Sequence, residues 1–381
     1  MSFLLTLILL CIPFQIKAEL SGEFNSAFFV NYLHDNNLFR RSGDDASGNG
    51  ILSDQVRTLG VTVSSDLRYF RQNMSASITV FDVRYSEFDF LDYQGGTAGV
   101  NWDWLRGRQW YGNVNFSGSH RRTQSANYSF LDDKITEVAA KFAVKRKLTQ
   151  RQRLDFSGYY EEARHSSTTL KGANRQKISL RPGFSLTNKA LTQYAIFFEL
   201  TKAQFPERDA ESLLTDGYEE LRVIAQYRIF PREHDQLSAR ISITGRNNKN
   251  STRDYTGLTG TVAYSWYFTD KINIDAALVR DVVNSDVEVA SYYVQYSTNT
   301  SLNWGISTKV ELFSEFSYNR NKYGDDLGRT DKEKSLSIGF TYSPIRILSA
   351  KASLTDLSRG STVKTREYDA RRINLEISIQ I

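Results

Sequence analysis

The sequence has almost no cysteine, no long apolar run and little net charge. Its one cysteine, Cys11, lies within the first 18 residues, so disulfide bonds cannot hold the rest of the chain together as they do in small secreted domains. No later stretch reaches about 18 consecutive apolar residues, which excludes a membrane-spanning helix. The formal net charge of +5 is too small to indicate a nucleic-acid-binding protein.

The first residues have the pattern of a secretory signal peptide. An apolar run from Phe3 to Phe14 precedes Ile16-Lys17-Ala18, a small-residue cleavage site before Glu19. This run is too short to span a membrane. We therefore predict a signal peptide at residues 1–18 and one domain at residues 19–381.

Beyond residue 18, apolar and polar residues alternate with a period of two, which is typical of strands with one apolar face. The last ten residues, 372–381, alternate without interruption. Such a long apolar edge strand would be an aggregation site in a soluble protein, whereas a membrane barrel pairs its last strand with its first. The same alternation recurs at 110–118, 237–244, 335–342 and 348–355.

Short turns and long polar connections alternate along the chain. The short turns recur about every 40 residues, which leaves room for two long strands in each repeat. We predict an all-β, antiparallel, up-and-down transmembrane barrel of about 18 strands, with 16 as the alternative, with short periplasmic turns and long extracellular loops. The short turns are expected near residues 69, 106, 149, 189, 231, 270, 305 and 345.

All five tryptophans fall within a few residues of a predicted short turn, as expected for an aromatic belt at one membrane interface. They are Trp102, Trp104, Trp110, Trp266 and Trp304.

Two segments depart from the regular pattern. Pro182 lies inside the expected strand Lys177–Leu186 and removes a hydrogen-bond donor, which predicts a bulge or a local break. The alternation in Met74–Tyr85 changes phase at Phe81, which predicts a second bulge.

If the apolar faces meet lipid, the residues between them line a lumen wide enough for water. The charged residues there allow two interpretations: ion pairs that brace the wall, or a basic track that favours an acidic or hydroxyl-rich solute. The candidate lumen residues are Arg181, Arg222, Arg228, Arg240, Arg246, Lys351, Arg372, Glu311 and Glu315.

The sequence has little catalytic chemistry. Three of its four histidines, His34, His120 and His165, fall towards the long-loop rim, and His34 precedes Asp35 as a protease dyad would require. No spacing specifies a nucleophile, and no His/Cys cluster suggests a metal site. Gly48-Asn49-Gly50 lacks the third glycine of a phosphate loop. We predict no catalytic residues, no metal and no cofactor, and the first long loop is a candidate plug.

The start of the mature chain carries a resemblance to a known family. Phe28 to Arg40, with Asp35-Asn36-Asn37-Leu38-Phe39 at its centre, is followed by Ser53-Asp54. This pattern resembles the β-barrel porins encoded with exopolysaccharide synthesis and export genes in Gram-negative bacteria. The C-terminal Ile381 departs from the aromatic ending common in such barrels.

The resemblance implies an outer-membrane exit for a polysaccharide, with membrane lipid and a periplasmic export protein as partners. Export of an exopolysaccharide in biofilm formation is therefore our first hypothesis. A general or solute-specific diffusion porin is the second, and an adhesive surface protein acting through its loops is the third. The identity of the polymer, the direction of transport, gating, and a monomeric or trimeric state stay open.

Overall fold

The computed structural model describes residues 21–42, 52–123, 131–188, 192–208, 214–232, 234–249, 254–285, 291–324 and 328–381. The predicted signal peptide, the Gly48-Asn49-Gly50 segment and residues 43–51 of the candidate plug lie outside the described residues. Within these ranges, no helix has the length and apolarity needed to cross a membrane.

The described chain forms 18 antiparallel strands in one sheet, as the sequence predicts. The strands are β1 (Ser21–Asp35), β2 (Asp54–Tyr69), β3 (Gln72–Tyr85), β4 (Tyr93–Arg106), β5 (Trp110–Arg122), β6 (Lys134–Lys147), β7 (Gln152–His165), β8 (Arg175–Thr187), β9 (Gln193–Gln204), β10 (Gly217–Ile229), β11 (Gln236–Asn248), β12 (Tyr255–Thr269), β13 (Ile272–Asn284), β14 (Tyr292–Gly305), β15 (Val310–Tyr323), β16 (Thr330–Ile345), β17 (Leu348–Ser361) and β18 (Tyr368–Gln380).

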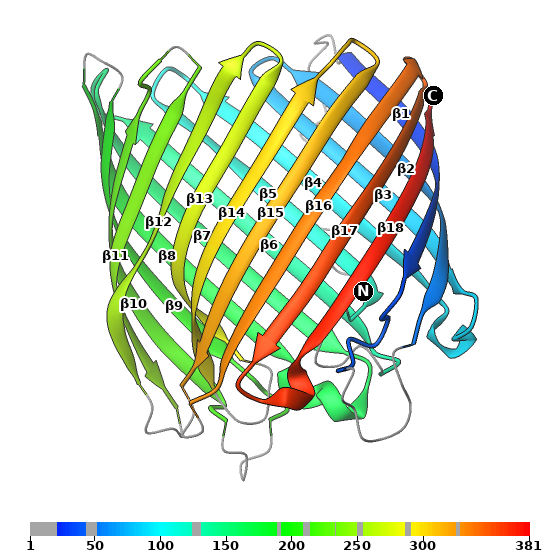
Figure 1. The fold of residues 1–381 in the computed structure, drawn as a ribbon. Helices are drawn as coiled ribbons and strands as arrows, with labels where there is room; N and C mark the ends of the chain where they lie inside the picture. The colour runs from blue at the N-terminus through cyan, green and yellow to red at the C-terminus, as the bar shows by residue number, and fades with distance from the viewer. Residues whose placement is uncertain are drawn as a thin grey trace, which may run out of the picture.

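The sheet closes into a barrel because β1 pairs with both β2 and β18. Every other strand pairs with its neighbours in sequence, so the topology is a simple up-and-down meander (Figure 1). The last residue takes part in the closure, since the Ile381 amide donates to the Ser26 carbonyl at 2.7 Å and the Ser26 amide returns a bond at 2.8 Å. Pairing therefore removes the apolar edge that the final strand would otherwise expose.

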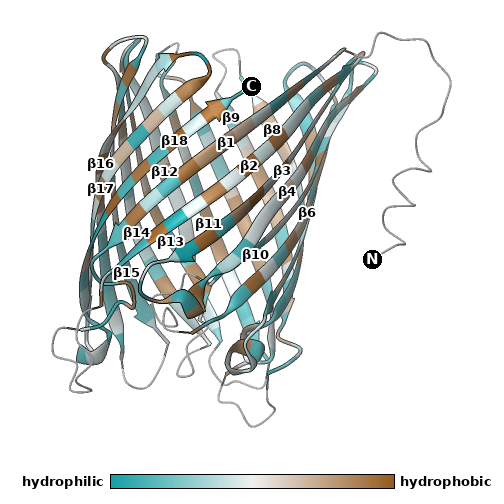
Figure 2. Cartoon of the chain, turned by 90° about the vertical axis from the view of Figure 1, so that its right-hand side faces the viewer, coloured by the Kyte–Doolittle hydropathy of each residue, from teal (hydrophilic) through white to brown (hydrophobic). Residues whose placement is uncertain are grey.

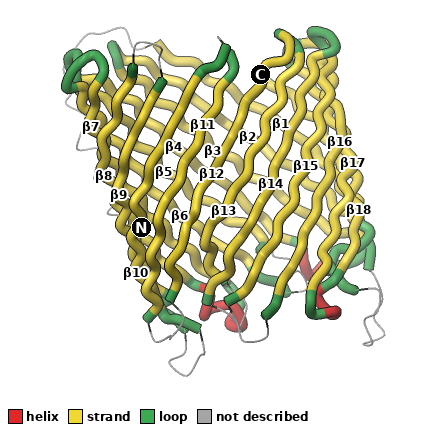
Figure 3. The backbone as a smooth tube through the Cα atoms, turned by 60° about the vertical axis from the view of Figure 1, so that its left-hand side comes forward, coloured by secondary structure: helices red, strands yellow, loops and turns green. Residues whose placement is uncertain are grey.

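The two rims of the barrel differ. The short turns lie at the rim that also holds the C-terminus, at the top of Figure 1, and the longer connections lie at the opposite rim. Three short 3₁₀ helices, Asp89–Leu91, Thr168–Ala173 and Lys364–Arg366, belong to the long connections and appear at the lower rim in Figure 3. Short periplasmic turns and long extracellular loops are the layout of outer-membrane barrels.

Alternating side chains cover the two faces of the wall. Along β18, Leu375 and Ile377 are 52% and 54% exposed on the outside, while the neighbouring residues Asn374 and Glu376 are less exposed and face inward. Figure 2 shows the resulting alternation of apolar and polar residues along the strands. All five tryptophans lie on the outward face near the short-turn rim, which confirms the predicted aromatic belt.

The two predicted irregularities have different outcomes. Pro182 does interrupt the β8–β9 ladder, because paired positions skip from Leu180 to Gly183, but the register does not shift and there is no bulge. The predicted bulge at Phe81 is wrong, since β2 and β3 pair continuously from Val56 to Tyr69. The phase changes because Phe81 and Val83 are apolar residues on the inner face, not because the strand turns over.

Candidate functional site

The candidate lumen residues all lie on the inner face of their strands. Arg222 lies between Leu221 and Val223, which are 48% and 39% exposed on the outer wall, and Arg240 precedes Ile241, which is 58% exposed. The candidates are distributed over β8 (Arg181), β10 (Arg222, Arg228), β11 (Arg240, Arg246), β15 (Glu311, Glu315), β17 (Lys351) and β18 (Arg372).

Arg222 and Arg246 are held in ion pairs along the wall. Arg222 lies 2.6 Å from Glu220 and 3.0 Å from Asp281, and Arg246 lies 2.7 Å from Glu220. Their side chains are only 15% and 3% exposed. A buried charge that keeps its partner braces the structure and leaves little of its charge for a solute.

Two further candidates also have carboxylate partners. Arg372 contacts Asp35 at 2.8 Å, and Arg181 reaches Glu199 at the longer distance of 3.9 Å. The interpretation of the lumen charges as ion pairs that brace the wall therefore holds for part of the candidate lumen residues.

Arg228 and Arg240 have a different environment. Arg240 donates to the Thr261 hydroxyl at 3.3 Å, and the buried Nε of Arg228 has no hydrogen-bond partner among the described residues. Arg228 pairs with Ser238, which is two residues from Arg240 on β11. The two arginines are therefore diagonal neighbours on adjacent strands, with backbone positions about 7–8 Å apart. In the described part of the chain, neither is recorded in an ion pair with a carboxylate.

The inward-facing residues around this arginine pair are uncharged. They are Gln193 and Ala195 on β9, Gln226 on β10, Ser238 and Ser242 on β11, and Thr261 and Ala263 on β12. The positive charge of the pair is therefore directed into the lumen. Two guanidinium groups with free donors make a suitable site for a carboxylate, which accepts paired N–H bonds.

Lysines beside tyrosines extend the basic wall. The ammonium groups of Lys145 and Lys147 lie 5.8 and 5.4 Å from the Tyr111 ring. Those of Lys141 and Lys177 lie 5.3 and 6.0 Å from the Tyr159 ring. These contacts are cation–π interactions on the inner face of β5–β8. The alternation could have identified Lys147, Lys177 and the two tyrosines, but not that they meet.

The opposite wall carries acidic residues. In a ring of 18 strands, β15 to β18 lie across the lumen from β6 to β9. Glu311 and Glu315 project from β15, and Glu376 on β18 pairs in register with Lys351 on β17. Lys351 lies 4.5 Å above the Phe313 ring. The lumen is therefore more basic on one side and more acidic on the other, an arrangement that orients and selects charged solutes.

The motif that carries the family resemblance has a structural role at the long-loop rim. The Asn37 amide group donates to the carbonyls of Arg41 and Asp369 at 2.9 and 2.8 Å, and Phe39 packs edge-to-face on Phe88 at 4.8 Å. These contacts join the β1–β2 connection to β18 and to the β3–β4 connection. At the next strand, Asp54 accepts the amides of Ser86, Glu87 and Phe88.

The structure excludes a His34–Asp35 dyad. His34 is exposed on the outer face, whereas Asp35 points inward and binds arginines. The structure instead pairs His165 with Asp133 at 2.6 Å, a contact between residues 32 apart in sequence that spacing does not predict. Both side chains are buried, and the described residues contain no cluster of His, Cys, Asp and Glu able to hold a metal ion.

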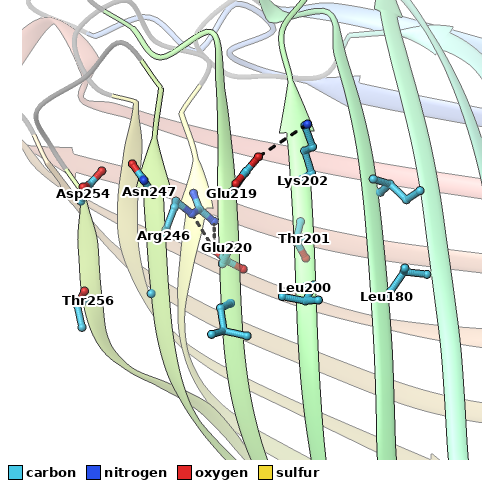
Figure 4. A pocket seen from close by; sticks show the side chains of 13 residues that line it. Leu180, Leu200, Thr201, Lys202, Glu219, Glu220, Arg246, Asn247, Asp254 and Thr256 are labelled. Carbon is cyan, nitrogen blue, oxygen red and sulfur yellow. Dashed lines mark hydrogen bonds and ion pairs between the residues drawn. The ribbon is translucent and has the colours of Figure 1, made fainter.

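The outer wall also has a groove near the long-loop rim, formed across β8 to β12 (Figure 4). Its apolar floor includes Leu180, Leu200 and Leu221. Its outward-facing lysine, Lys202, lies 3.8 Å from Glu219, and Asp254 adds a second carboxylate to the lining, so this groove has no excess positive charge. The Glu220–Arg246 pair seen behind it belongs to the lumen side.

Residues 246–381 match the family model described as "Putative beta-barrel porin 2". No protein with a curated description matches the chain in sequence. The matched segment includes the strands from β12 to the closing strand β18. It does not include the N-terminal motif that carries the resemblance noted above.

Several crystal structures share the fold. Pseudomonas aeruginosa OpdK, solved with vanillate, has a TM-score of 0.51 and 9% identity, and the match covers 94% of this chain and 99% of that one. Acinetobacter baumannii OccAB3 has a TM-score of 0.51 and 8% identity, covering 95% and 100%. P. aeruginosa OccK2 in complex with glucuronate has a TM-score of 0.51 and 10% identity, covering 95% and 98%.

At sequence identities of 8–10%, the similarity to these structures shows a shared fold only. The closed 18-stranded wall, its apolar outer face and its aromatic belt agree with that likeness. The chain has the fold of Gram-negative outer-membrane porins, and residues 246–381 carry the sequence match to a β-barrel porin family.

Proposed function

We propose that the barrel is a diffusion channel selective for small organic carboxylates. The observation that carries this proposal is the Arg228–Arg240 pair, which faces the lumen among uncharged neighbours. Hydrogen bonds between guanidinium groups and carboxylates contribute about 1.5–3 kcal/mol each. That is enough to retain a passing anion briefly without trapping it.

Two further observations support an anionic solute of modest size. Glu311 and Glu315 on β15, in the same lumen, would repel its carboxylate away from their own part of the wall and accept hydrogen bonds from its hydroxyl groups. Among the proteins of similar fold, OpdK was solved with vanillate and OccK2 with glucuronate, and both ligands are carboxylates.

Single-channel recording in a planar bilayer tests this function. Under a salt gradient we expect the reversal potential of an anion-selective pore. Glucuronate should interrupt the current at concentrations where glucose, a neutral sugar of similar size, does not. Equal responses to glucuronate and glucose, or a cation-selective pore, would contradict the proposal.

The export of an acidic exopolysaccharide is the second candidate. Tyr111 and Tyr159, each flanked by two lysines, offer aromatic faces for sugar rings beside charges that attract uronate groups. The family resemblance of the N-terminal motif points the same way. This function needs a periplasmic export protein as a partner.

Deletion of the gene separates the two candidates. For an export channel, surface polysaccharide should disappear while synthesis in the cytoplasm continues. For a diffusion channel, surface polysaccharide stays and growth on limiting carboxylates slows.

A further inference from the structure

A row of cations crosses the outer, lipid-facing wall near the long-loop rim. Arg280 on β13 pairs with Tyr296 on β14, Tyr296 pairs with Arg320 on β15, and Arg320 pairs with Lys332 on β16. Lys322 and Lys334 flank this row on β15 and β16. We call Arg280, Arg320, Lys322, Lys332 and Lys334 the outer basic cluster.

The members of the cluster face outward. They share the face of Leu278, Phe316 and Leu336, which are 58%, 40% and 42% exposed. The residues between them, such as Asn321 and Asp331, are buried on the inner side. Arg280 donates to the Tyr296 hydroxyl at 3.2 Å, and the ammonium group of Lys322 lies 5.8 Å from the same ring. Tyr296 therefore holds two of the cations close together.

Four other outward-facing cations near this rim have carboxylate partners on the same face. The pairs are Arg84 with Asp82 and Asp92, Arg164 with Glu162, Lys202 with Glu219, and Arg371 with Asp356.

Within the described ranges, no member of the outer basic cluster forms an ion pair. The outward-facing acid nearest in register is Asp356, two residues before Ser358, the partner of Lys334. Asp356 is held by Arg371 at 2.7 Å. Five like charges on one patch of wall repel one another, so the site lacks the anion that would balance it.

The position of the cluster indicates where that anion comes from. Arg320 is three residues from the end of β15 and Lys332 is two residues from the start of β16. Both are thus at the outer interface, where a lipid-facing cation costs little. Lipid headgroups surround this part of the barrel. Headgroup phosphates carry the charge and the acceptor oxygens that arginine and lysine bind best.

A groove of about 560 Å³ opens in the wall next to the cluster. Arg280, Tyr296 and Arg320 line one part of it. The rest of its lining includes apolar outward-facing side chains: Ile241, Leu258, Val262 and Leu278. Gly260, between Ile241 and Arg280 in the ladder, contributes no side chain. A cationic end joined to an apolar trough matches an amphiphile with an anionic head and an acyl chain.

We propose that this surface is a binding site for the phosphorylated glycolipid of the outer leaflet. The cluster binds the sugar-linked phosphates, and the groove accepts one acyl chain. The Lys202 groove on the other side of β11 has a similar apolar floor but no excess positive charge, so the charge of the cluster is what distinguishes the proposed site. The inference does not depend on the solute that crosses the lumen.

Native mass spectrometry of the purified barrel with added lipids tests the proposal. We expect diphosphorylated lipid A to bind at least ten-fold more tightly than the same lipid with its phosphates removed. The substitutions R280Q, R320Q, K332Q and K334Q together should abolish this difference. K202Q, which removes a balanced cation from the neighbouring groove, should leave it unchanged.

The heat-dependent gel shift of folded barrels checks that each variant is assembled. If the quadruple variant fails to assemble, R280Q/R320Q alone should weaken binding at least three-fold. Equal binding of the two forms of lipid A, or a quadruple variant that binds like wild type, would overturn the proposal. Phosphatidylglycerol that binds as tightly as lipid A would also overturn it, because the anion would then be any phospholipid.

Discussion

Asp35 at the end of β1 accepts a hydrogen bond from Arg372 of β18 at 2.8 Å, across the seam where the barrel closes. The same carboxylate binds Arg40 at 2.6 Å, and the side chains of Asp35 and Arg40 are 1% and 5% exposed. One buried aspartate therefore joins the first strand, the last strand and the connection that follows β1. This arrangement gives the N-terminal motif a role in closing the wall.

The substitution D35A should destabilise the barrel by about 3–5 kcal/mol, because it leaves the buried charge of Arg40 without a partner. The free energy of unfolding in urea with lipid vesicles measures this loss. D356A is the matched control, since Asp356 and Arg371 are 51% and 61% exposed and such a pair contributes under about 1 kcal/mol. Equal losses of unfolding free energy in the two variants would show that Asp35 contributes no more to stability than an exposed ion pair does.

The double substitution R228Q/R240Q should shift the reversal potential towards cation selectivity and weaken block by glucuronate about ten-fold or more. The loss of one charged hydrogen bond to the solute corresponds to about 1.5–3 kcal/mol. Single-channel recording measures both effects. E311Q/E315Q on β15 should move selectivity the other way. If both double variants left selectivity unchanged, lumen charge would not control passage.

Gly60 provides space for the Phe29 ring on the inner wall. It pairs with Phe29 on β1 and Phe81 on β3, and a methyl group at Gly60 would lie 2.2 Å from the Phe29 ring. The substitution G60A should therefore cost about 1–3 kcal/mol, measured by urea unfolding. F29A should relieve the clash in the double variant. G245A is the control, because nothing lies within 4 Å of a methyl group there. A G60A barrel as stable as G245A would contradict this packing.

Asp133 in the β5–β6 connection predicts a pH dependence. Burial raises the pKa of its carboxyl, but bonds from Thr123, His165 and the Ser167 amide outweigh burial and hold the pKa below its usual range. In the unfolded chain the pKa is ordinary. The stabilisation is therefore fully present above that ordinary value and is lost as pH falls through the lower folded value.

The substitution D133N should cost about 1–3 kcal/mol at neutral pH, and the difference from wild type should shrink as acid protonates Asp133. Thermal unfolding in detergent across this pH range measures it. A difference that stays constant with pH would show that the charge of Asp133 is unimportant.

The sequence by itself determined the architecture of this protein. Lipid contacts every second residue of a spanning strand, so the pattern of Ile373, Leu375 and Ile377 must repeat wherever the wall crosses the membrane. The same period predicted the inward direction of the lumen residues, and the position of the tryptophans beside the short turns predicted the aromatic belt. It was misleading at Phe81 because an apolar residue on the inner face looks like a change of phase.

Only the tertiary structure decided which charges are paired. Arg222 and Arg228 are alike in sequence, yet Arg222 meets Glu220 beside it and Asp281 three strands away. Arg228 lies among neutral neighbours. Lys202, which has Glu219 as its partner, and the row of cations at Arg320 differ in the same way. The physical reason is that alternation gives the face of each residue, whereas pairing depends on strand register and on the curvature of the closed wall.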